Sequence, residues 1–162
     1  MTADQQLLDA ALRAWRSNAD RAEAFFRPLS EEQLQQEIAP GRNRLLYLLG
    51  HLAAVHDAMF PLLGIGPRLH PELEAPFLAN ADRAVPSPHS ADDLRQRLGE
   101  IDAALWSAFG RWTPAEFLDR HTAVSDEEFR KEPHRNRFSV LLSRTTHVGF
   151  HLGQMVLTNP PR

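Results

Sequence analysis

Residues 89–113, HSADDLRQRLGEIDAALWSAFGRWT, show the pattern that decides the fold. The stretch contains no proline, and large apolar side chains recur along it every three or four residues, at Leu94, Leu98, Ile101, Leu105 and Phe109. This spacing places them along one side of an α-helix. Ser90, three residues before Asp93, has the spacing of a helix N-cap. The stretch therefore predicts an amphipathic helix with one buried face.

Three further stretches without proline, 1–27, 41–60 and 134–159, carry apolar residues at similar spacing. Proline breaks the interior of a helix, and six of the twelve prolines lie within 61–88, which predicts a long irregular connection there. The chain has 23 Leu and 21 Ala but only six Val, three Ile and six Thr, so strand-forming residues are scarce. We expect an all-α protein, a four-helix bundle forming a single domain over 1–162. The long connection allows the second and third helices to run parallel.

Short helical turns are expected between the long helices. Ser30–Gln33 and Thr113–Glu116 have the spacing of a capping box, and Pro114 stands at the favoured first helical position. Thr2 and Gln5 have the same spacing at the start of the first helix.

Composition narrows the class of protein. The 162 residues include no cysteine, which excludes disulfides, thiolate metal ligands and a cysteine nucleophile. The net charge of −3 argues against nucleic-acid binding. The first residues lack the basic start and apolar core of a signal peptide, and the apolar stretch 45–67 is interrupted by polar residues, so we expect a buried helix, no membrane contact and a cytoplasmic protein. Seventeen Arg against one Lys, with abundant Ala and Pro, is typical of GC-rich bacterial genes.

The histidines are the main candidate site. His147 and His151 lie four residues apart, so both side chains project from one face of the last long helix. His51 lies in an apolar stretch of the second helix, where a buried imidazole needs a partner. Three neutral imidazoles would bind a metal ion and leave coordination positions open, as in catalytic sites. The alternative is that these histidines are merely hydrogen-bonded or exposed.

These residues resemble a known family, the DinB-like superfamily of damage-inducible proteins. The resemblance rests on HVGFHLGQ at 147–154, on Phe138–Leu142 before it, and on Leu49-Gly50-His51-Leu52 in the earlier helix. It implies a four-helix bundle of up-down-down-up type, often a homodimer, with a divalent metal ion bound by His51, His147 and His151. Nickel, zinc and iron all suit imidazole ligands.

The resemblance also implies a reaction class. Related proteins include S-transferases and an isomerase that use low-molecular-weight thiols such as bacillithiol, mycothiol or glutathione. We therefore expect a metal-dependent enzyme acting on a small-molecule substrate, with a thiol as cosubstrate because the chain has no cysteine of its own. A metal-bound thiol would be nucleophilic as its thiolate. The alternative is a non-catalytic metal-binding or small-ligand-binding protein of the stress response. No catalytic residue is identified.

Several other residues allow two interpretations. Gly149 and Gly153 indicate either close approach of a neighbouring backbone or a solvent-facing side. His56 lies about 140° around the helix from His51 and should not bind the same ion, and its proximity to Asp57 suits a position on the helix surface or the rim of the site. Asp57 lies on a different face of the helix from His51. Gln154 either orients a ligand or crosses a dimer contact, or it only packs or contacts solvent.

Two groups of residues complete the candidates. The basic residues Arg130, Lys131, His134, Arg135 and Arg137 form either an anion site or, as their glutamate neighbours favour, a solvated loop. The aromatic residues Trp106, Phe109 and Trp112 belong either to the core or to a dimer interface.

Overall fold

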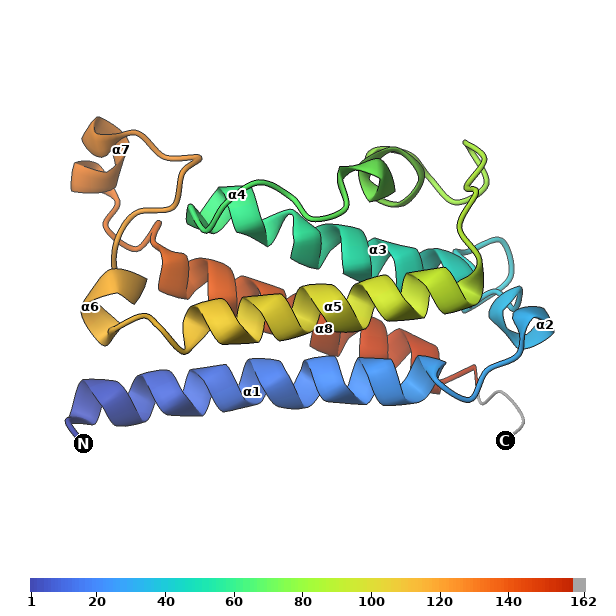
Figure 1. Cartoon of the computed structure of the whole chain (residues 1–162), viewed down its shortest axis with the longest axis horizontal. Helices are drawn as coiled ribbons and strands as arrows, with labels where there is room; N and C mark the ends of the chain where they lie inside the picture. Colours follow the sequence, from blue (N-terminus) through green and yellow to red (C-terminus); the bar gives the residue numbers. More distant parts are fainter. Residues whose placement is uncertain (159–162) are drawn as a thin grey trace.

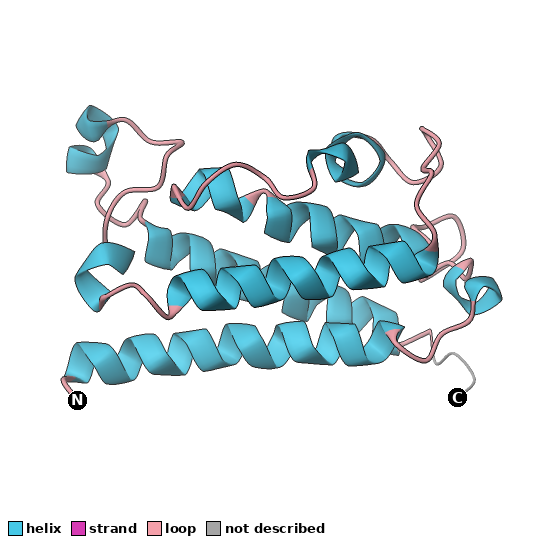
Figure 2. Ribbon diagram, viewed as in Figure 1, coloured by secondary structure: helices cyan, strands magenta, loops and turns pink. Residues whose placement is uncertain are grey.

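The computed structural model describes residues 1–158, which form helices and connections without a strand (Figures 1 and 2). The α-helices are α1 (Ala3–Phe26), α2 (Glu31–Leu34), α3 (Leu45–Asp57), α4 (Met59–Leu63), α5 (Ala91–Phe109), α6 (Pro114–Phe117), α7 (Asp126–Lys131) and α8 (Arg137–Val156). A 3-10 turn, η1 (Pro71–Leu73), and a π-helical turn, η2 (Ala75–Ala79), lie between α4 and α5. The prediction of an all-α protein is confirmed.

The four longest helices lie side by side. α1 packs against α5 and α8, and α3 packs against the same two helices from the other side. Figure 1 shows α1 and α8 running in one direction and α3 and α5 in the other. Each helix therefore packs against two of the other three, and the apolar residues on the inward faces form the core.

The predicted helix starts are confirmed. The hydroxyl of Thr2 accepts a hydrogen bond from the Gln5 N–H at 3.2 Å, and complete capping boxes begin α2 at Ser30 and α6 at Thr113. The α7 helix was not predicted, although Ser125 and Glu128 form the same capping box there. Each cap satisfies backbone N–H groups that have no partner within the helix.

The position of the prolines predicted that the second helical stretch would end before Pro61, but helical structure continues past this residue. α3 ends at Asp57 and α4 continues after Ala58 through Pro61 to Leu63. Pro61 is tolerated because it lies in the first turn of α4, where a backbone N–H needs no helical partner. The stretch Leu45–Leu63 is apolar and long enough to cross a membrane, but 72% of its most apolar window is buried within the molecule, as in the core helix of a soluble protein.

The connection between α4 and α5 is only partly irregular. It contains η1 and η2, and both turns pack on α3. Leu73 and Phe77 are buried there, at 0% and 4% exposure. This segment therefore forms part of the wall around α3, the helix that carries His51.

Candidate metal centre

The structure brings His51, His147 and His151 together between α3 and α8. The Nε2 atom of His147 lies 3.2 Å from Nε2 of His51 and 3.1 Å from Nε2 of His151. The three rings each offer one ligand atom, and these atoms all lie within 4.8 Å of one another. His147 and His151 share a face of α8 because they are one turn apart, whereas His51 reaches them through the packing of α3 on α8.

The hydrogen bonds of the Nδ1 atoms, which point away from the cluster, fix the tautomers of His51 and His151. Nδ1 of His51 lies 2.8 Å from the backbone oxygen of Phe77, and Nδ1 of His151 lies 2.8 Å from Oε1 of Gln154. Both oxygens only accept hydrogen bonds, so both rings carry their proton on Nδ1. The Nε2 atoms of His51 and His151 therefore present lone pairs toward His147. Gln154, one of the residues with two interpretations, orients the His151 ring.

Hydrogen bonds among the three rings cannot provide a donor for both the His51 and the His151 lone pairs. His147 Nε2 carries at most one proton when neutral, and it faces two acceptors. A cation at the centre would satisfy all three lone pairs. Neutral imidazole nitrogens are ligands that nickel, zinc and iron accept, and the three ligand atoms lie within 4.8 Å of one another. The donor set thus fits a divalent metal ion.

Burial keeps the three imidazoles neutral. Burial, followed by the charges of the neighbouring His151 and His51, lowers the pKa of His147 to about 3. Burial is also the main cause of the lowered pKa values of His51 and His151. Neutral imidazole is the form that binds a metal ion, because a proton competes for the same lone pair.

The His51 ring is held by a group that sequence reasoning missed. The ring of Tyr47 stacks on His51 at a centroid distance of 5.8 Å, and its hydroxyl donates a hydrogen bond to the backbone oxygen of Asn80 at 2.8 Å. The ring of Phe77 lies directly over Gly50, where an added Cβ would be 2.5 Å from two of its carbon atoms. A glycine next to His51 in a helix of large apolar residues was the available signal.

The interpretation of Gly149 and Gly153 as points of close backbone approach is wrong for the part of the chain that the structure describes. A Cβ on Gly149 would meet only the side-chain nitrogen of Asn18, at 3.7 Å, and a Cβ on Gly153 would meet nothing within 4 Å. Gly153 is exposed, as the alternative interpretation expected.

The expectation that His56 lies on the helix surface or the rim is also wrong. His56 is 1% exposed, and its Nδ1 lies 2.5 Å from Oδ1 of Asp102, an equally buried residue of α5. Asp57 is fully buried as well, and its carboxylate accepts hydrogen bonds from the backbone N–H groups of Leu69 and His70. Neither residue contacts the three histidines. Both instead tie α3 to neighbouring segments.

The basic residues before α8 are mostly paired with acids, as the loop interpretation favoured. Lys131 pairs with Glu127 at 2.7 Å, Arg135 with Glu132 at 3.2 Å and Arg137 with Asp119 at 3.3 Å. Arg130 and His134 are exposed.

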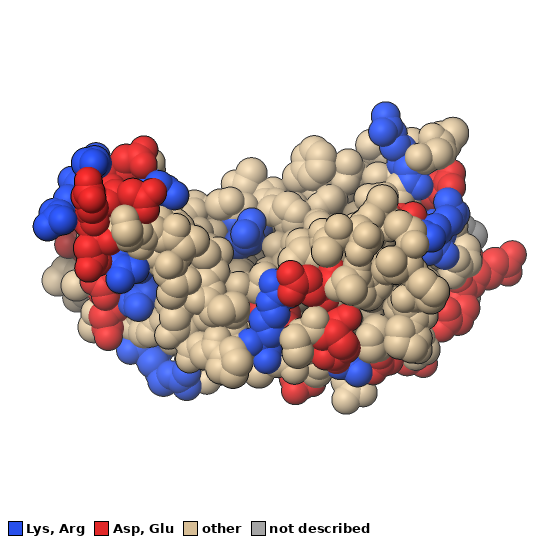
Figure 3. All heavy atoms as spheres, turned by 90° about the horizontal axis from the view of Figure 1, so that it is seen from above, with Lys and Arg blue, Asp and Glu red and all other residues tan. Residues whose placement is uncertain are grey.

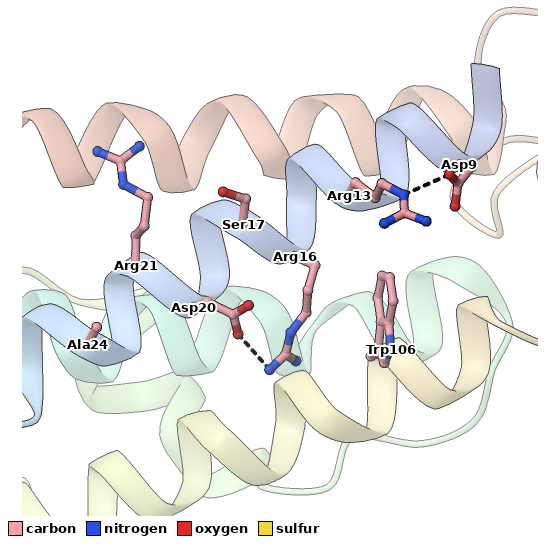
Figure 4. A pocket seen from close by; sticks show the side chains of 8 residues that line it. All are labelled: Asp9, Arg13, Arg16, Ser17, Asp20, Arg21, Ala24 and Trp106. Carbon is pink, nitrogen blue, oxygen red and sulfur yellow. Dashed lines mark hydrogen bonds and ion pairs between the residues drawn. The ribbon is translucent and has the colours of Figure 1, made fainter. Parts of the chain in front are cut away.

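Of the aromatic residues, Trp112 packs against the core and against Phe109, at a centroid distance of 6.2 Å, and the dimer interface stays a prediction. Phe109 is buried in the core, whereas Trp106 is 40% exposed and stacks on Trp15 at a centroid distance of 6.5 Å. Trp106 borders a hollow of about 560 Å³ along α1 (Figure 4). Four of the charged side chains of this hollow pair with one another, Arg13 with Asp9 and Arg16 with Asp20, and Arg21 also lines it. The histidine cluster is the stronger candidate site, because its three ligand atoms converge.

Comparison with known proteins gives the family. Among curated proteins, no match to the chain was found. A model of the DinB superfamily matches residues 14–155, a range that contains α3, most of α8 and all three clustered histidines. The match covers most of the chain and agrees with the resemblance of its histidine motif. The chain belongs to the DinB superfamily.

Proposed function

We propose that this protein is a metal-dependent enzyme whose divalent ion, nickel, zinc or iron, is held by His51, His147 and His151. One observation carries the proposal: three Nε2 atoms converge, and the outer hydrogen bonds of two rings leave only lone pairs facing inward. Membership of the DinB superfamily supports it.

The proposed reaction is transfer of a low-molecular-weight thiol, such as bacillithiol, mycothiol or glutathione, to a small electrophile. When bound, the metal ion supplies Lewis acidity that lowers the pKa of a thiol at the site. The chain's own contribution is to hold the imidazoles: the backbone of Phe77 orients His51, and Gln154 orients His151. His51 and His147 are half-buried, which supports access for a small molecule.

A second candidate function is non-catalytic binding of a metal ion or a small ligand in the stress response. It is favoured by the surroundings of the cluster. Within residues 1–158, the only hydrogen-bond partners of these rings besides each other are the oxygens of Phe77 and Gln154. Among the described residues, no acidic or basic side chain is hydrogen-bonded to the cluster to serve as a general acid or base.

The proposal extends to architecture and assembly. We propose a four-helix bundle of up-down-down-up type, forming one domain in a cytoplasmic bacterial protein, and the helix directions in Figure 1 support this topology. We also propose a homodimer. Apolar side chains that lie exposed on α8, Leu142, Phe150 and Val156 at 45%, 61% and 51%, support a protein interface.

The first test is the metal content of untagged protein, measured by mass spectrometry. We expect near-stoichiometric nickel, zinc or iron in the native protein and in His134→Ala, which removes an exposed histidine outside the cluster. His51→Ala and His147→Ala should lose the metal while keeping the native circular dichroism spectrum. Native protein that takes up none of the three ions would contradict the proposal.

The second test separates the two candidate functions. Metal-loaded protein is mixed with each thiol and an aryl halide, and thioether formation is followed by absorbance. Turnover that disappears in His151→Ala supports the enzyme. Stoichiometric metal without turnover for any thiol favours the binding protein.

A further inference from the structure

One arginine on α8 has no partner. Arg144 is half-buried, and within the described residues no hydrogen bond or ion pair involves any of its nitrogens. Its Nε is fully buried and unpaired. Burial lowers the pKa of this guanidinium, because water is removed and no carboxylate replaces it, yet arginine stays charged at neutral pH. A half-buried charge without a partner is unfavourable, and a bound anion would offset the cost.

Arg144 lines a cavity of about 300 Å³ between α8, the end of α4 and the segment around α7. His121, Arg135 and Ser143 also line it, and Leu62 and Val140 provide apolar surface. Nδ1 of His121 is buried and has no partner either. The two residues that carry these unpaired atoms thus border one cavity, which combines apolar surface with a few polar side chains, the composition of a small-molecule site.

The charges around the cavity indicate which anion it suits. Arg135 is compensated by Glu132 at 3.2 Å. Burial and, secondly, the charge of Arg135 lower the pKa of His121, so this imidazole is neutral at pH 7. Figure 3 shows that charges of both signs gather at the end of the molecule that carries α6 and α7. One uncompensated positive charge therefore remains, on Arg144. It matches one carboxylate, whereas a phosphate dianion would leave an excess negative charge.

The cavity lies beside the histidine cluster. Arg144 precedes His147 by three residues, so the two side chains project from the same side of α8, about 4.5 Å apart along its axis. After burial and the two other histidines, the charge of Arg144 also contributes to the low pKa of His147. An acid with a chain of a few carbon atoms can therefore reach from one group toward the other.

We propose that this cavity binds the carboxylate of a small organic acid, with Arg144 as the charged partner, so that the other end of the acid lies toward His147. The assignment of the carboxylate site depends only on the cavity. The placement of the acid's other end at a reacting centre rests on the proposed function.

The carboxylate site is tested on metal-free protein, where no ion competes for the acid. Butyrate is titrated into ¹⁵N-labelled protein, and amide shifts are followed by NMR. We expect saturable shifts around residues 143–144 and 121, no such shifts with the neutral butyramide, and weaker binding of inorganic phosphate. In Arg144→Gln the affinity for butyrate should fall about tenfold or more, because a charge-assisted hydrogen bond is lost. Arg144→Lys should retain part of it.

Two controls keep this test decisive. Arg42→Gln removes an exposed arginine far along the chain from the cavity and should bind butyrate as the native protein does. Arg144→Gln should be at least as stable in urea as the native protein, because the substitution removes a half-buried charge without a partner. Equal butyrate affinity in Arg144→Gln and native protein, or equal shifts with butyramide, would overturn the carboxylate site.

The placement is tested with Co²⁺-loaded protein, in which the paramagnetic ion speeds the relaxation of nearby ligand protons. If the carboxylate is held at Arg144, the methyl protons of butyrate should relax faster than the protons next to the carboxylate. The reverse order means that the carboxylate binds the ion directly, and it overturns the placement. Protein that takes up no cobalt would contradict the proposed function, while Arg144-dependent butyrate binding would still support the carboxylate site.

Discussion

Replacing Gly50 by alanine tests how closely η2 packs on the helix that carries His51. The added Cβ would lie 2.5 Å from Cγ and Cε1 of Phe77, whereas ordinary contacts begin at 3.4 Å. The ring must therefore move by about 1 Å. It has little room to do so, because Phe77 is 4% exposed and packs beside Tyr47 at a centroid distance of 6.1 Å.

Two effects of opposite sign determine how much Gly50→Ala changes the free energy of unfolding. Overpacking of this kind costs about 1–3 kcal/mol, and the better helix propensity of alanine returns about 1 kcal/mol. Gly99→Ala, in the interior of α5, is the matched control, because its Cβ would meet only Oε2 of Glu23, at an ordinary 3.8 Å. We expect Gly50→Ala to lower the free energy of unfolding by up to about 2 kcal/mol and Gly99→Ala to raise it by up to about 1 kcal/mol.

The assay is urea unfolding of metal-free protein at 25 °C, followed by far-ultraviolet circular dichroism. Zinc affinity, measured by competition with a chelator, should fall about tenfold in Gly50→Ala, because the carbonyl of Phe77 shifts away from Nδ1 of His51. Gly50→Ala combined with Phe77→Leu should recover part of the stability. If Gly50→Ala stabilises the protein as Gly99→Ala does, Phe77 does not lie where the structure places it and the reasoning fails.

Three further predictions concern the buried polar groups. Because the three clustered histidines have lowered pKa values, the folded metal-free protein binds fewer protons than the unfolded chain at acidic pH. Its free energy of unfolding should therefore fall as the pH drops below about 6.5 and continue to fall toward the pKa of His147, about 3. Urea midpoints at pH 7 and pH 5 should differ less in His147→Ala than in the native protein. Asp102→Ala leaves the buried ring of His56 without its partner and should cost about 1–3 kcal/mol in urea unfolding, a prediction that an unchanged midpoint would refute. Tyr47→Phe removes the hydrogen bond to the backbone of Asn80 and should cost about 0.5–1.5 kcal/mol, and a native midpoint in this variant would mean that the hydroxyl is equally well bonded to water.

Local sequence patterns predicted the long helices because their causes are local. The apolar residues of α5 recur with the helical period, and all five of its predicted core residues, Leu94, Leu98, Ile101, Leu105 and Phe109, are at most 2% exposed. The capping spacings predicted where α1, α2, α5 and α6 begin. The prediction that the helical stretch ends before Pro61 was wrong, because no residue pattern indicates the break after Asp57. This break places Pro61 in the first turn of α4, where proline is tolerated.

The candidate site was predictable only in part. The spacing of His147 and His151 places them on one face of a helix, the apolar surroundings of His51 made it a candidate third ligand, and the family resemblance supported this set. The partner of His56 is Asp102, 46 residues away, and no local pattern connects the two. Arg144 gave no signal either, because its significance lies in the absence of a partner, which only the folded chain reveals.

The three tryptophans of this chain, Trp15, Trp106 and Trp112, lie on α1, on α5 and just after α5. Tryptophan fluorescence therefore reports on the surroundings of α1 and α5, including the contacts of Trp15 with His56 and of Trp112 with Arg137, while α3 and α8 carry no tryptophan of their own. His51 and His147 lie 96 residues apart in sequence, so they can bind one metal ion together only when α3 packs against α8. The visible absorption of a bound cobalt ion would thus follow the docking of α3 on α8, and coincidence of this signal with tryptophan fluorescence would show that the helices unfold in one cooperative transition.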